Sequence, residues 1–388
     1  MLFEMMKIVY CTDTVCYPGG IQTVTMVKAN ALAKIHGNRV WIVVTDHTQE
    51  PMIPLENVEL VNLDVNYYED DWKGYLYVLK GIFKKRRLHQ KRLQRVLNEI
   101  EPDIVVSTGT SEKNFLPTMR IPSSPVFIRE IHFEKNYRIR AARNLKDKMV
   151  AEVADFLDYG HYIKAYDRIV VLTEEDKTEN WKGWNQVVVI PNPMTVQPHQ
   201  MSDCCSRRAL AAGRLVQQKH FASLIRVWNE VAKWHPDWTL EIWGSGEQEQ
   251  MLRDTILKFH LEEKVYLKGF TSHLNDEMGT ASMFLLSSDF EGFPLVIIEA
   301  MSVGLPVVAY ACPTGPKDII EDGKNGFLIP MQDEKLFARK ICALIEDTDL
   351  RKNMGHQAWM KSKDYQMDKI IHKWMLLFEE LKAIKTVR

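Results

Sequence analysis

Short apolar segments with the composition of strands alternate with amphipathic helical patterns along this 388-residue chain. Six such segments lie in the first half, near residues 7–11, 39–44, 103–107, 126–130, 168–172 and 187–190. Six more follow near residues 209–212, 239–243, 264–267, 283–287, 306–310 and 326–329. Strands separated by helices pair in parallel, and a parallel sheet is covered by helices on both faces. The pattern therefore predicts an α/β protein built from parallel sheets.

A proline-rich segment divides this pattern into two halves. Residues 190–199, Ile-Pro-Asn-Pro-Met-Thr-Val-Gln-Pro-His, hold three prolines, which interrupt regular structure and are typical of linkers. We predict a first domain at residues 1–193 and a second at residues 194–363, each long enough for its own core. Residues 364–388 form a further amphipathic helical pattern. Its apolar positions are Ile370, Ile371, Trp374, Leu377, Phe378 and Leu381.

Composition indicates a soluble enzyme. The formal net charge of −1 argues against a protein that binds nucleic acid by general phosphate neutralisation. No apolar run reaches the length that crosses a bilayer, and the N-terminal residues lack the basic flank and apolar core of a signal peptide. The six cysteines form neither a Cys-x-x-Cys pair nor a regular framework, so we expect free thiols. These features predict a cytoplasmic location.

Two carboxylates frame an apolar segment in the second half. Glu291 and Glu299 are eight residues apart, and Glu299 is the only charge in an otherwise apolar stretch. Pro294 suits the first turn of a helix and Gly304 suits its C-terminal cap, so residues 293–303 are predicted to form a buried helix. An unpaired buried carboxylate is costly, which favours a hydroxyl-rich or cationic ligand as its partner. A structural ion pair with a distant Lys or Arg explains it equally well.

Two cations follow the first strand of the second half. Arg214 and Lys219 belong to a Gly-Arg-x4-Lys segment, at the sheet edge where open α/β folds bind ligands. A glycine pair, Gly19 and Gly20, follows the first strand of the chain and precedes a helical pattern. Amides at a helix N-terminus favour anions, and glycine permits close approach. A basic pair after a strand is usually solvated surface, so the other motifs decide the interpretation.

Taken in order, these segments resemble the retaining glycosyltransferases of family GT4, which have the GT-B fold. The resemblance rests on the glycine loop, the Gly-Arg-x4-Lys segment and the Glu-x7-Glu segment, and it extends over nearly the whole chain. It implies two Rossmann-like domains that face each other across a cleft, the first binding the acceptor and the second a nucleotide sugar. It also implies that the C-terminal helix crosses back to the first domain.

The resemblance implies a donor site centred on the second domain. Arg214 and Lys219 match the clamp on the donor diphosphate. Glu299 would accept hydrogen bonds from the ribose hydroxyls, and Glu291 would face the donor sugar. Backbone amides and the loops around the nucleobase would complete the site, although Pro294 has no N–H to donate. The remaining expected donor contacts are Gly19, Gly20, Gly244, Gly269, Phe270, Gly292, Phe293, Pro294 and Leu295.

The same resemblance extends to the chemistry of transfer. His132 matches a histidine that lies over the donor sugar, although a lone histidine after a strand is more often an ordinary residue. Residues 107–111 would line the acceptor side. Retention is attributed to front-face attack, in which the leaving phosphate helps to deprotonate the acceptor hydroxyl. We therefore expect catalysis to depend on His132, Arg214, Lys219 and Glu291, with no cofactor and no metal.

Residues 313–326 carry information about the substrate. This Gly-Pro-x-x-Ile-Ile loop resembles bacterial enzymes that build capsule, O-antigen or lipid-linked oligosaccharides from UDP-linked sugars. The expected function is transfer of a hexose or N-acetylhexosamine from a UDP-sugar to a sugar hydroxyl of a glycan or polyprenyl-diphosphate-linked acceptor.

A basic segment offers a further partner. Residues 72–95 are aromatic and then densely basic, from Lys84 to Arg95, with no acidic residue. Such a cluster can dock reversibly on an anionic membrane surface, with Tyr75, Tyr77 and Phe83 at headgroup level. A solvated helix face is the equal alternative.

Two other classes of protein remain as alternatives. The first is a GT-B epimerase or phosphorylase that acts on a similar ligand, which the Glu-x7-Glu segment disfavours and a product assay separates. The second is a dinucleotide-dependent oxidoreductase or a non-catalytic nucleotide-binding protein. Its expected G-x-G-x-x-G after the first strand is missing, because Cys11 to Gly20 contains only the glycine pair.

Overall fold

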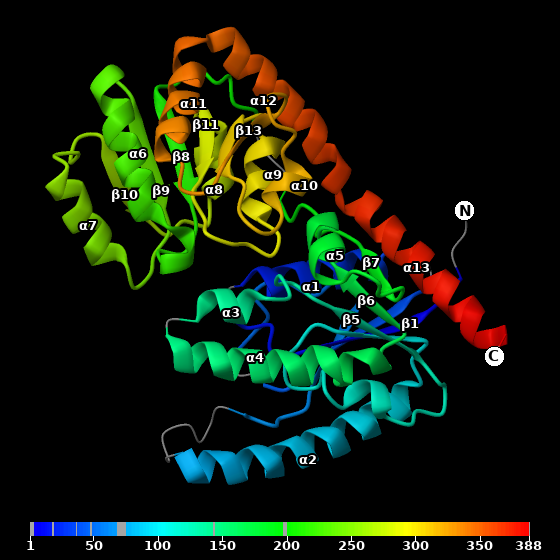
Figure 1. Ribbon diagram of the computed structural model, residues 1–388. Helices are drawn as coiled ribbons and strands as arrows, with labels where there is room; N and C mark the ends of the chain where they lie inside the picture. Colours follow the sequence, from blue (N-terminus) through cyan, green and yellow to red (C-terminus); the bar gives the residue numbers. More distant parts are fainter. Residues whose placement is uncertain are drawn as a thin grey trace. The chain divides into compact units, whose positions relative to one another are not determined.

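The computed structural model describes residues 4–17, 19–35, 37–46, 49–67, 75–142, 144–196 and 200–387, with the side chains of 75–82, 386 and 387 excepted. The chain forms two compact units (Figure 1). The first comprises Met1–Leu172, Asn180–Pro193 and Met367–Arg388, and the second comprises Thr173–Glu179 and Met194–Gln366.

These units differ from the expected domain bounds at two places. Thr173–Glu179 groups with the second unit, because the backbone amides of Glu174 and Glu175 donate to the Asp318 carboxylate and Lys317 lies 2.5 Å from Glu175. The last helix begins at Met367 rather than at residue 364. Residues 197–199 of the proline-rich segment lie outside the described ranges.

The first unit holds a parallel sheet with the order β3-β2-β1-β4-β5-β6-β7 in its described residues. The strands are β1 (Lys7–Thr12), β2 (Arg39–Val44), β3 (Val58–Asn62), β4 (Ile104–Ser107), β5 (Val126–Glu130), β6 (Arg168–Val171) and β7 (Val187–Val189). The predicted parallel sheet is thus confirmed. Strand β3 was not predicted, because polar Glu59 and Asn62 interrupt its apolar run. It lies at the edge of the sheet and pairs only with β2, so it needs no continuous apolar sequence.

Two apolar layers enclose this sheet. Ile8 and Tyr10 of β1 belong to one layer and Val9 to the other, as the alternation of side chains along a strand requires. The first layer includes Ile370, Trp374 and Phe378 from the C-terminal helix. The helices of this unit are α1 (Gly20–Ala33), α2 (Tyr75–Ile100), α3 (Tyr137–Ala141), α4 (Leu145–Gly160) and α13 (Met367–Val387), with short 3-10 turns at Leu116–Thr118 and Tyr162–Ala165.

The second unit holds a parallel sheet with the order β10-β9-β8-β11-β12-β13. Its strands are β8 (Arg208–Ala212), β9 (Thr239–Trp243), β10 (Val265–Gly269), β11 (Met283–Leu286), β12 (Val307–Tyr310) and β13 (Gly326–Ile329). Its helices are α6 (Phe221–Trp234), α7 (Glu249–Lys258), α8 (Leu274–Gly279), α9 (Leu295–Ser302), α10 (Pro316–Ile319), α11 (Glu334–Glu346) and α12 (Thr348–Ser362), with 3-10 turns at Gln217–Lys219 and Lys363–Tyr365. The short helix α5 (Glu174–Asn180) joins the two units along the chain.

Each sheet reverses its strand order at one point. In the first unit the reversal lies between β1 and β4, and in the second it lies between β8 and β11. Loops that leave the carboxyl ends of such a pair diverge and leave room for a ligand. The segments that follow β1, β4, β8 and β11 are therefore where a site is expected.

Candidate functional site

A partly buried ion pair forms beside the reversal point of the second sheet. Lys219 Nζ lies 2.6 Å from Glu291 Oε1, and the two side chains are 15% and 8% exposed. The Ser288 hydroxyl donates to the same oxygen at 2.6 Å. No described residue donates to Glu291 Oε2. Glu291 therefore fixes the ammonium group of Lys219 with one oxygen and leaves the other for a ligand.

The loops that carry this pair are bound tightly to each other. The Asp289 amide donates to Gln218 O at 2.8 Å, and Gln218 Nε2 donates to Phe290 O at 2.7 Å. The Ser287 hydroxyl donates to Lys219 O at 2.8 Å. These bonds join the segment after β8 to the segment after β11, so the ion pair is held in place before any ligand binds.

Arg214 differs from Lys219 in having no partner among the described residues. Its side chain is exposed, and none of the described residues accepts a hydrogen bond from it. It follows Gly213, whose φ of +155° is unfavourable for other residues. A Cβ atom at Gly213 would lie 3.1 Å from Lys219 Cε, so glycine here lets the Lys219 side chain pass. The site thus has one fixed cation and one available cation.

The loops after β9 and β10 meet the loop after β8. Gly213 N donates to Trp243 O at 3.0 Å, and Gly244 N donates to Gly269 O at 2.8 Å. A Cβ atom on Gly244 would come within 1.9 Å of Gly213 O, which only glycine avoids. The Phe270 ring beyond these glycines is 76% exposed. Gly244, Gly269 and Phe270 therefore lie at the same sheet edge as Arg214.

Glu299 lies on helix α9, which begins at Leu295 with Pro294 as its N-cap residue, slightly later than predicted. Gly304, with φ of +81°, and Leu305 return their amides to Met301 O and Ala300 O and close the helix. The sequence prediction of glycine at the helix C-terminus is correct.

The Glu299 side chain is half-buried. Oε1 accepts a hydrogen bond from the Thr195 hydroxyl at 3.3 Å, and loss of water around the group raises its pKa. The alternative of a structural ion pair finds no cation within reach among the described residues. The carboxylate thus has one weak neutral partner and keeps capacity for more.

The expected amides at residues 292–295 are only partly available. Leu295 N donates to Phe293 O at 2.9 Å, so the expectation that this amide faces a ligand is wrong for this structure. Pro294 has no N–H, as noted from the sequence. The amides of Gly292 and Phe293 have no acceptor within the described residues and remain the two that can donate.

In the first unit, Gly19 and Gly20 open helix α1. Gly19 is the N-cap residue with an extended backbone at φ −174°, and no side chain caps the helix. The first amides of the helix are therefore open to an anion. Ile21, in the first turn, lines the same pocket as His132, so the glycine pair and the histidine lie close together.

His132 is buried, and its Nε2 has no hydrogen-bond partner, with Glu130 Oε1 3.5 Å away. Burial lowers the pKa of His132 to about 4, against the attraction of Glu130. The imidazole is therefore neutral near pH 7. Glu130 itself pairs with Lys28, and both side chains are 1% exposed. Burial lowers the pKa of Lys28, whereas that of Glu130 is lowered because the attraction of its cationic neighbours outweighs burial.

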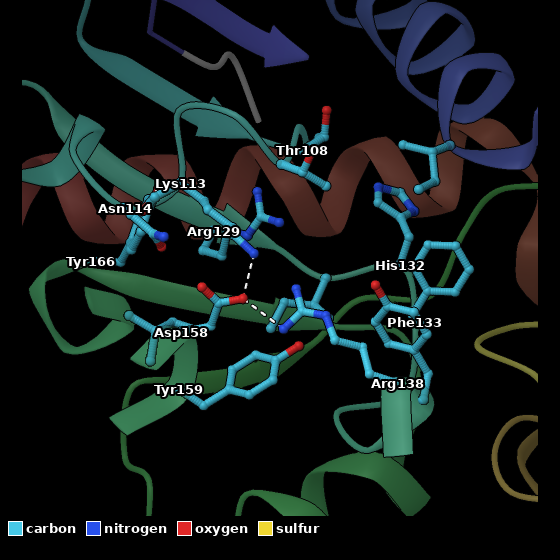
Figure 2. A pocket seen from close by; sticks show the side chains of 15 residues that line it. Thr108, Lys113, Asn114, Arg129, His132, Phe133, Arg138, Asp158, Tyr159 and Tyr166 are labelled. Carbon is cyan, nitrogen blue, oxygen red and sulfur yellow. Dashed lines mark hydrogen bonds and ion pairs between the residues drawn. The ribbon is translucent and has the colours of Figure 1, made fainter. Parts of the chain in front are cut away.

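The pocket that contains His132 is lined by charged and aromatic side chains that sequence reasoning missed (Figure 2). Thr108 and Thr110, from the segment expected to face the acceptor, line it as well. Lys113, Arg129 and Arg138 supply its cations. Only Arg129 left a trace in the sequence, as a cation inside an apolar strand. Lys113 and Arg138 lie in ordinary polar loops and carried no signal.

The chain is similar in sequence to known glycosyltransferases. Residues 206–359 match the model of the family Glycosyl transferases group 1. An uncharacterized glycosyltransferase of Haemophilus influenzae is 28% identical over 380 residues, which cover 95% of this chain and 99% of that protein. The GtfA subunit of a UDP-N-acetylglucosamine--peptide N-acetylglucosaminyltransferase from Streptococcus pneumoniae is 32% identical over 365 residues, covering 87% of this chain and 71% of the relative. The chain belongs to the group 1 glycosyltransferases.

Solved structures show that this glycosyltransferase has the GT-B fold, as the resemblance implied. A sucrose-phosphate synthase from Thermosynechococcus elongatus has a TM-score of 0.78 at 16% identity and covers 98% of this chain and 100% of its own. TarM has a TM-score of 0.75 at 17% identity, over 97% and 99% of the two chains. At such identities the likeness concerns the fold alone.

Some of the cations on helix α2 of the glycosyltransferase bond to the rest of the first unit, and others are exposed. Lys85 donates to Asn66 O, and Arg92 donates to Leu63 O at 2.6 Å, so these two cations help to hold the first unit together. The exposed cations recur at helical spacing, as Lys84, Arg87, Lys91 and Arg95. Residues 72–74 and the side chains of Tyr75 and Tyr77 lie outside the described part, whereas Phe83 is exposed.

Two features are absent from the described residues of this glycosyltransferase. Within the described residues, no group of three His, Cys, Asp or Glu side chains is placed to hold a metal ion. One Asp-x-Asp tripeptide occurs in the sequence, at residues 347–349, where Asp347 caps helix α12 by accepting from the Leu350 amide at 2.8 Å. None of the helices in the described ranges is both long and apolar enough to cross a bilayer.

Proposed function

We propose that this glycosyltransferase moves a hexose or N-acetylhexosamine from a UDP-sugar to a hydroxyl group of a glycan or lipid-linked acceptor, with retention and without a metal. The observation that carries the proposal is the unpartnered Arg214 beside the fixed Lys219 at the reversal point of the second sheet. A sugar nucleotide leaves as a diphosphate, and cations held where this charge develops lower the barrier.

Each cation has a distinct part in this proposal. The planar guanidinium of Arg214 offers two parallel donors to phosphate oxygens. Lys219 is a point charge that Glu291 holds within 2.6 Å, so little reorganisation is needed when the bond breaks. The vacant Oε2 of Glu291 would accept a hydrogen bond from a donor-sugar hydroxyl. The neutral His132 would hydrogen-bond the sugar from the first unit without adding charge.

The remaining contacts follow the chemistry of the nucleoside. Glu299 would accept hydrogen bonds from ribose hydroxyls, because its carboxylate has only the Thr195 hydroxyl at 3.3 Å. The exposed Phe270 ring offers a face on which a base can stack. The amides of Gly292 and Phe293 would donate to the sugar, and those at the start of α1 to the phosphates.

Relatives support the donor and the process. Printed names include a poly(ribitol-phosphate) alpha-N-acetylglucosaminyltransferase of Staphylococcus aureus and the amylovoran biosynthesis glycosyltransferase AmsD of Erwinia amylovora. Solved structures of GtfA and of Anabaena HepE, which share the fold, contain UDP. We therefore favour UDP as the nucleotide and a bacterial cell-surface polysaccharide as the product, with a cytoplasmic site of synthesis.

We further propose that the exposed cations of α2 bring the first unit to an anionic membrane surface. Lys84, Arg87, Lys91 and Arg95 form one stripe, and Phe83 lies at its start. Each cation near an anionic leaflet contributes about 1 kcal/mol. Vesicle binding tests this proposal. We expect the protein to bind anionic vesicles but not zwitterionic ones, and we expect salt to weaken the binding. Equal binding to both kinds of vesicle would leave the stripe as a solvated helix face.

The proposed reaction is tested by a panel of UDP-, GDP- and ADP-sugars, with hydrolysis and transfer followed in the presence and absence of EDTA. We expect UDP-sugars to be turned over equally well with EDTA, because cationic side chains neutralise the diphosphate. Loss of activity with EDTA and recovery with Mn²⁺ would contradict the metal-independent proposal. Formation of an epimer or a sugar phosphate instead of a glycoside would favour the alternative GT-B activities.

Glu299→Gln tests the ribose contact. A hydrogen bond to a charged group contributes about 1.5–3 kcal/mol, so we expect UDP affinity to fall about 10- to 100-fold. The raised pKa of Glu299 means that its charged form is unfavourable in the folded state, so the neutral amide should leave the melting temperature unchanged or higher. Calorimetry and thermal melting check both parts, with the exposed Glu262→Gln as the matched control. A lower melting temperature with unchanged UDP affinity would make Glu299 a structural residue.

A further inference from the structure

Three cationic side chains from three different elements converge on one pocket of the first unit. Lys113 lies in the segment after β4, Arg129 on β5 and Arg138 on α3. Their side chains are only 16%, 12% and 22% exposed. Charges so far removed from water are costly unless anionic partners or hydrogen-bond acceptors surround them.

One carboxylate serves as the shared partner in the pocket. Asp158 lies 2.5 Å from Lys113 and 2.7 Å from Arg138, and Figure 2 shows it joined to both, with Arg129 beside them. Asp155 adds a second bond to Arg138 at 2.8 Å. The hydrogen bonds of Arg129 with described residues go to neutral acceptors, the Ser107 hydroxyl at 2.7 Å and Gly109 O at 2.6 Å.

Much of the donor capacity of the two arginines is unused. The hydrogen bonds and ion pairs that Arg129 and Arg138 form with described residues all use Nη1. Their Nε and Nη2 groups find no acceptor among the described residues. Among the described residues, the Lys113 ammonium group has Asp158 as its one acceptor. These groups line the pocket, so the unused N–H bonds are available to a molecule inside it.

A nearby glutamate, Glu112, does not neutralise the positive charge of the three cations. Glu112 is 4.0 Å from Arg129 and outside the lining. Burial, together with Asp13, raises the pKa of the Glu112 carboxyl to about 7, so much of it is protonated near neutral pH. The pocket therefore keeps an excess of positive charge around a space that is open to a ligand.

The pocket includes residues that the proposed glycosyl transfer uses. His132 and Thr108 line it, and the buried His132 Nε2 has no hydrogen-bond partner. The tyrosines Tyr137, Tyr159 and Tyr166 form walls, so the anion would be flanked by surfaces suited to sugar rings or an apolar chain.

We propose that Lys113, Arg129 and Arg138 bind a phosphate group of the acceptor. Guanidinium forks and an ammonium group match the tetrahedral oxyanion, and an excess of positive charge favours a dianion over a carboxylate. Asp158 positions the cations and competes with the phosphate for them. The inference rests on the proposed glycosyl transfer, because in that proposal the acceptor hydroxyl must reach the donor sugar that His132 contacts.

The test measures the dissociation constant of inorganic phosphate by calorimetry at fixed ionic strength. The full chain carries Arg214→Ala, which removes the exposed cation beside Lys219 as a competing anion site. In this background we expect Lys113→Gln and Arg138→Gln each to weaken phosphate binding about tenfold or more. The exposed Lys148→Gln on α4 is the matched control and should leave the constant unchanged.

A variant with the opposite expected sign separates binding from folding. Asp158→Asn removes the carboxylate that competes with phosphate and should tighten phosphate binding several-fold. If Asp158 only held the cations in place, the same substitution would weaken phosphate binding. Lys113→Arg, which keeps the charge, should retain affinity if Lys113→Gln does not fold. Absence of phosphate binding by the background protein, equal binding by Lys113→Gln, or weaker binding by Asp158→Asn would each overturn the proposal.

Two further arms identify the source of the phosphate. A soluble sugar 1-phosphate and vesicles of zwitterionic lipid that also contain phosphatidic acid are compared, each with and without Lys113→Gln. Loss of binding to the sugar phosphate in the variant assigns a soluble acceptor, and loss of binding to the vesicles assigns a lipid-borne one. UDP is titrated separately into the wild type. UDP binding without phosphate binding would refute only the proposal that the pocket binds phosphate. Phosphate binding without UDP binding or glycosyl transfer would refute only the proposed function.

Discussion

Replacing Arg214 with alanine is expected to lower kcat about 100- to 1,000-fold without a measurable loss of stability. Removal of one preorganised donor at a developing negative charge typically has an effect of about this size. The fold should be unaffected, because the Arg214 side chain is exposed and bonds to no described residue. Steady-state transfer from a UDP-sugar and thermal melting measure the two quantities.

The exposed Lys352→Ala in the same unit is the matched control and should change neither quantity. Lys219→Ala is a less clean test of the clamp, because it also leaves the 8% exposed carboxylate of Glu291 without its cation. Equal transfer rates for Arg214→Ala and wild type would remove Arg214 from the proposed mechanism.

Lys28→Met is expected to destabilise the first unit by about 3–5 kcal/mol. Lys28 and Glu130 form an ion pair whose side chains are both 1% exposed, and loss of one partner leaves the other charge buried without compensation. The ammonium also lies 4.6 Å from the centre of the Trp374 ring, a contact that the substitution removes. The denaturant-induced transition of the first unit measures the change.

Lys34→Met on the same helix is the matched control. Lys34 pairs with Glu56 at 2.9 Å, but the side chains are 61% and 57% exposed, so its loss should cost less than about 1 kcal/mol. The double variant Lys28→Met/Glu130→Gln should recover much of the lost stability, because no bare charge remains. Equal stability of the Lys28→Met and Lys34→Met variants would show that the buried pair does not stabilise the fold.

The sequence was sufficient to predict the parallel sheets because strands buried on both faces must be apolar throughout. It did not reveal β3, since an edge strand tolerates Glu59 and Asn62 among its apolar residues. Arg214 closely follows strand β8, and Lys219 lies in the 3-10 turn after it, so their position at the sheet edge could be predicted. Strand ends in a parallel sheet converge in space even when they are distant in sequence.

Other parts of the site depend on contacts that sequence spacing does not encode. Lys28 lies within a helical pattern and Glu130 at the end of a strand, 102 residues apart, and nothing local marks them as partners. The available amides at residues 292–295 depended on the turn at Pro294, which engages Leu295 N with Phe293 O. The same limit applies to Lys113 and Arg138, which only tertiary structure brings together.

The place of α13 in the first unit has a consequence for how the chain folds as it is made. Ile370, Trp374 and Phe378 fill one apolar layer of the first sheet, yet they are translated after all of the second unit. On the ribosome the second unit can finish folding once Gln366 has emerged. The first unit, although synthesised earlier, must wait with its apolar layer open until α13 is released. Nascent chains of this glycosyltransferase therefore pass through an interval in which that apolar surface lacks its covering helix and is prone to aggregation.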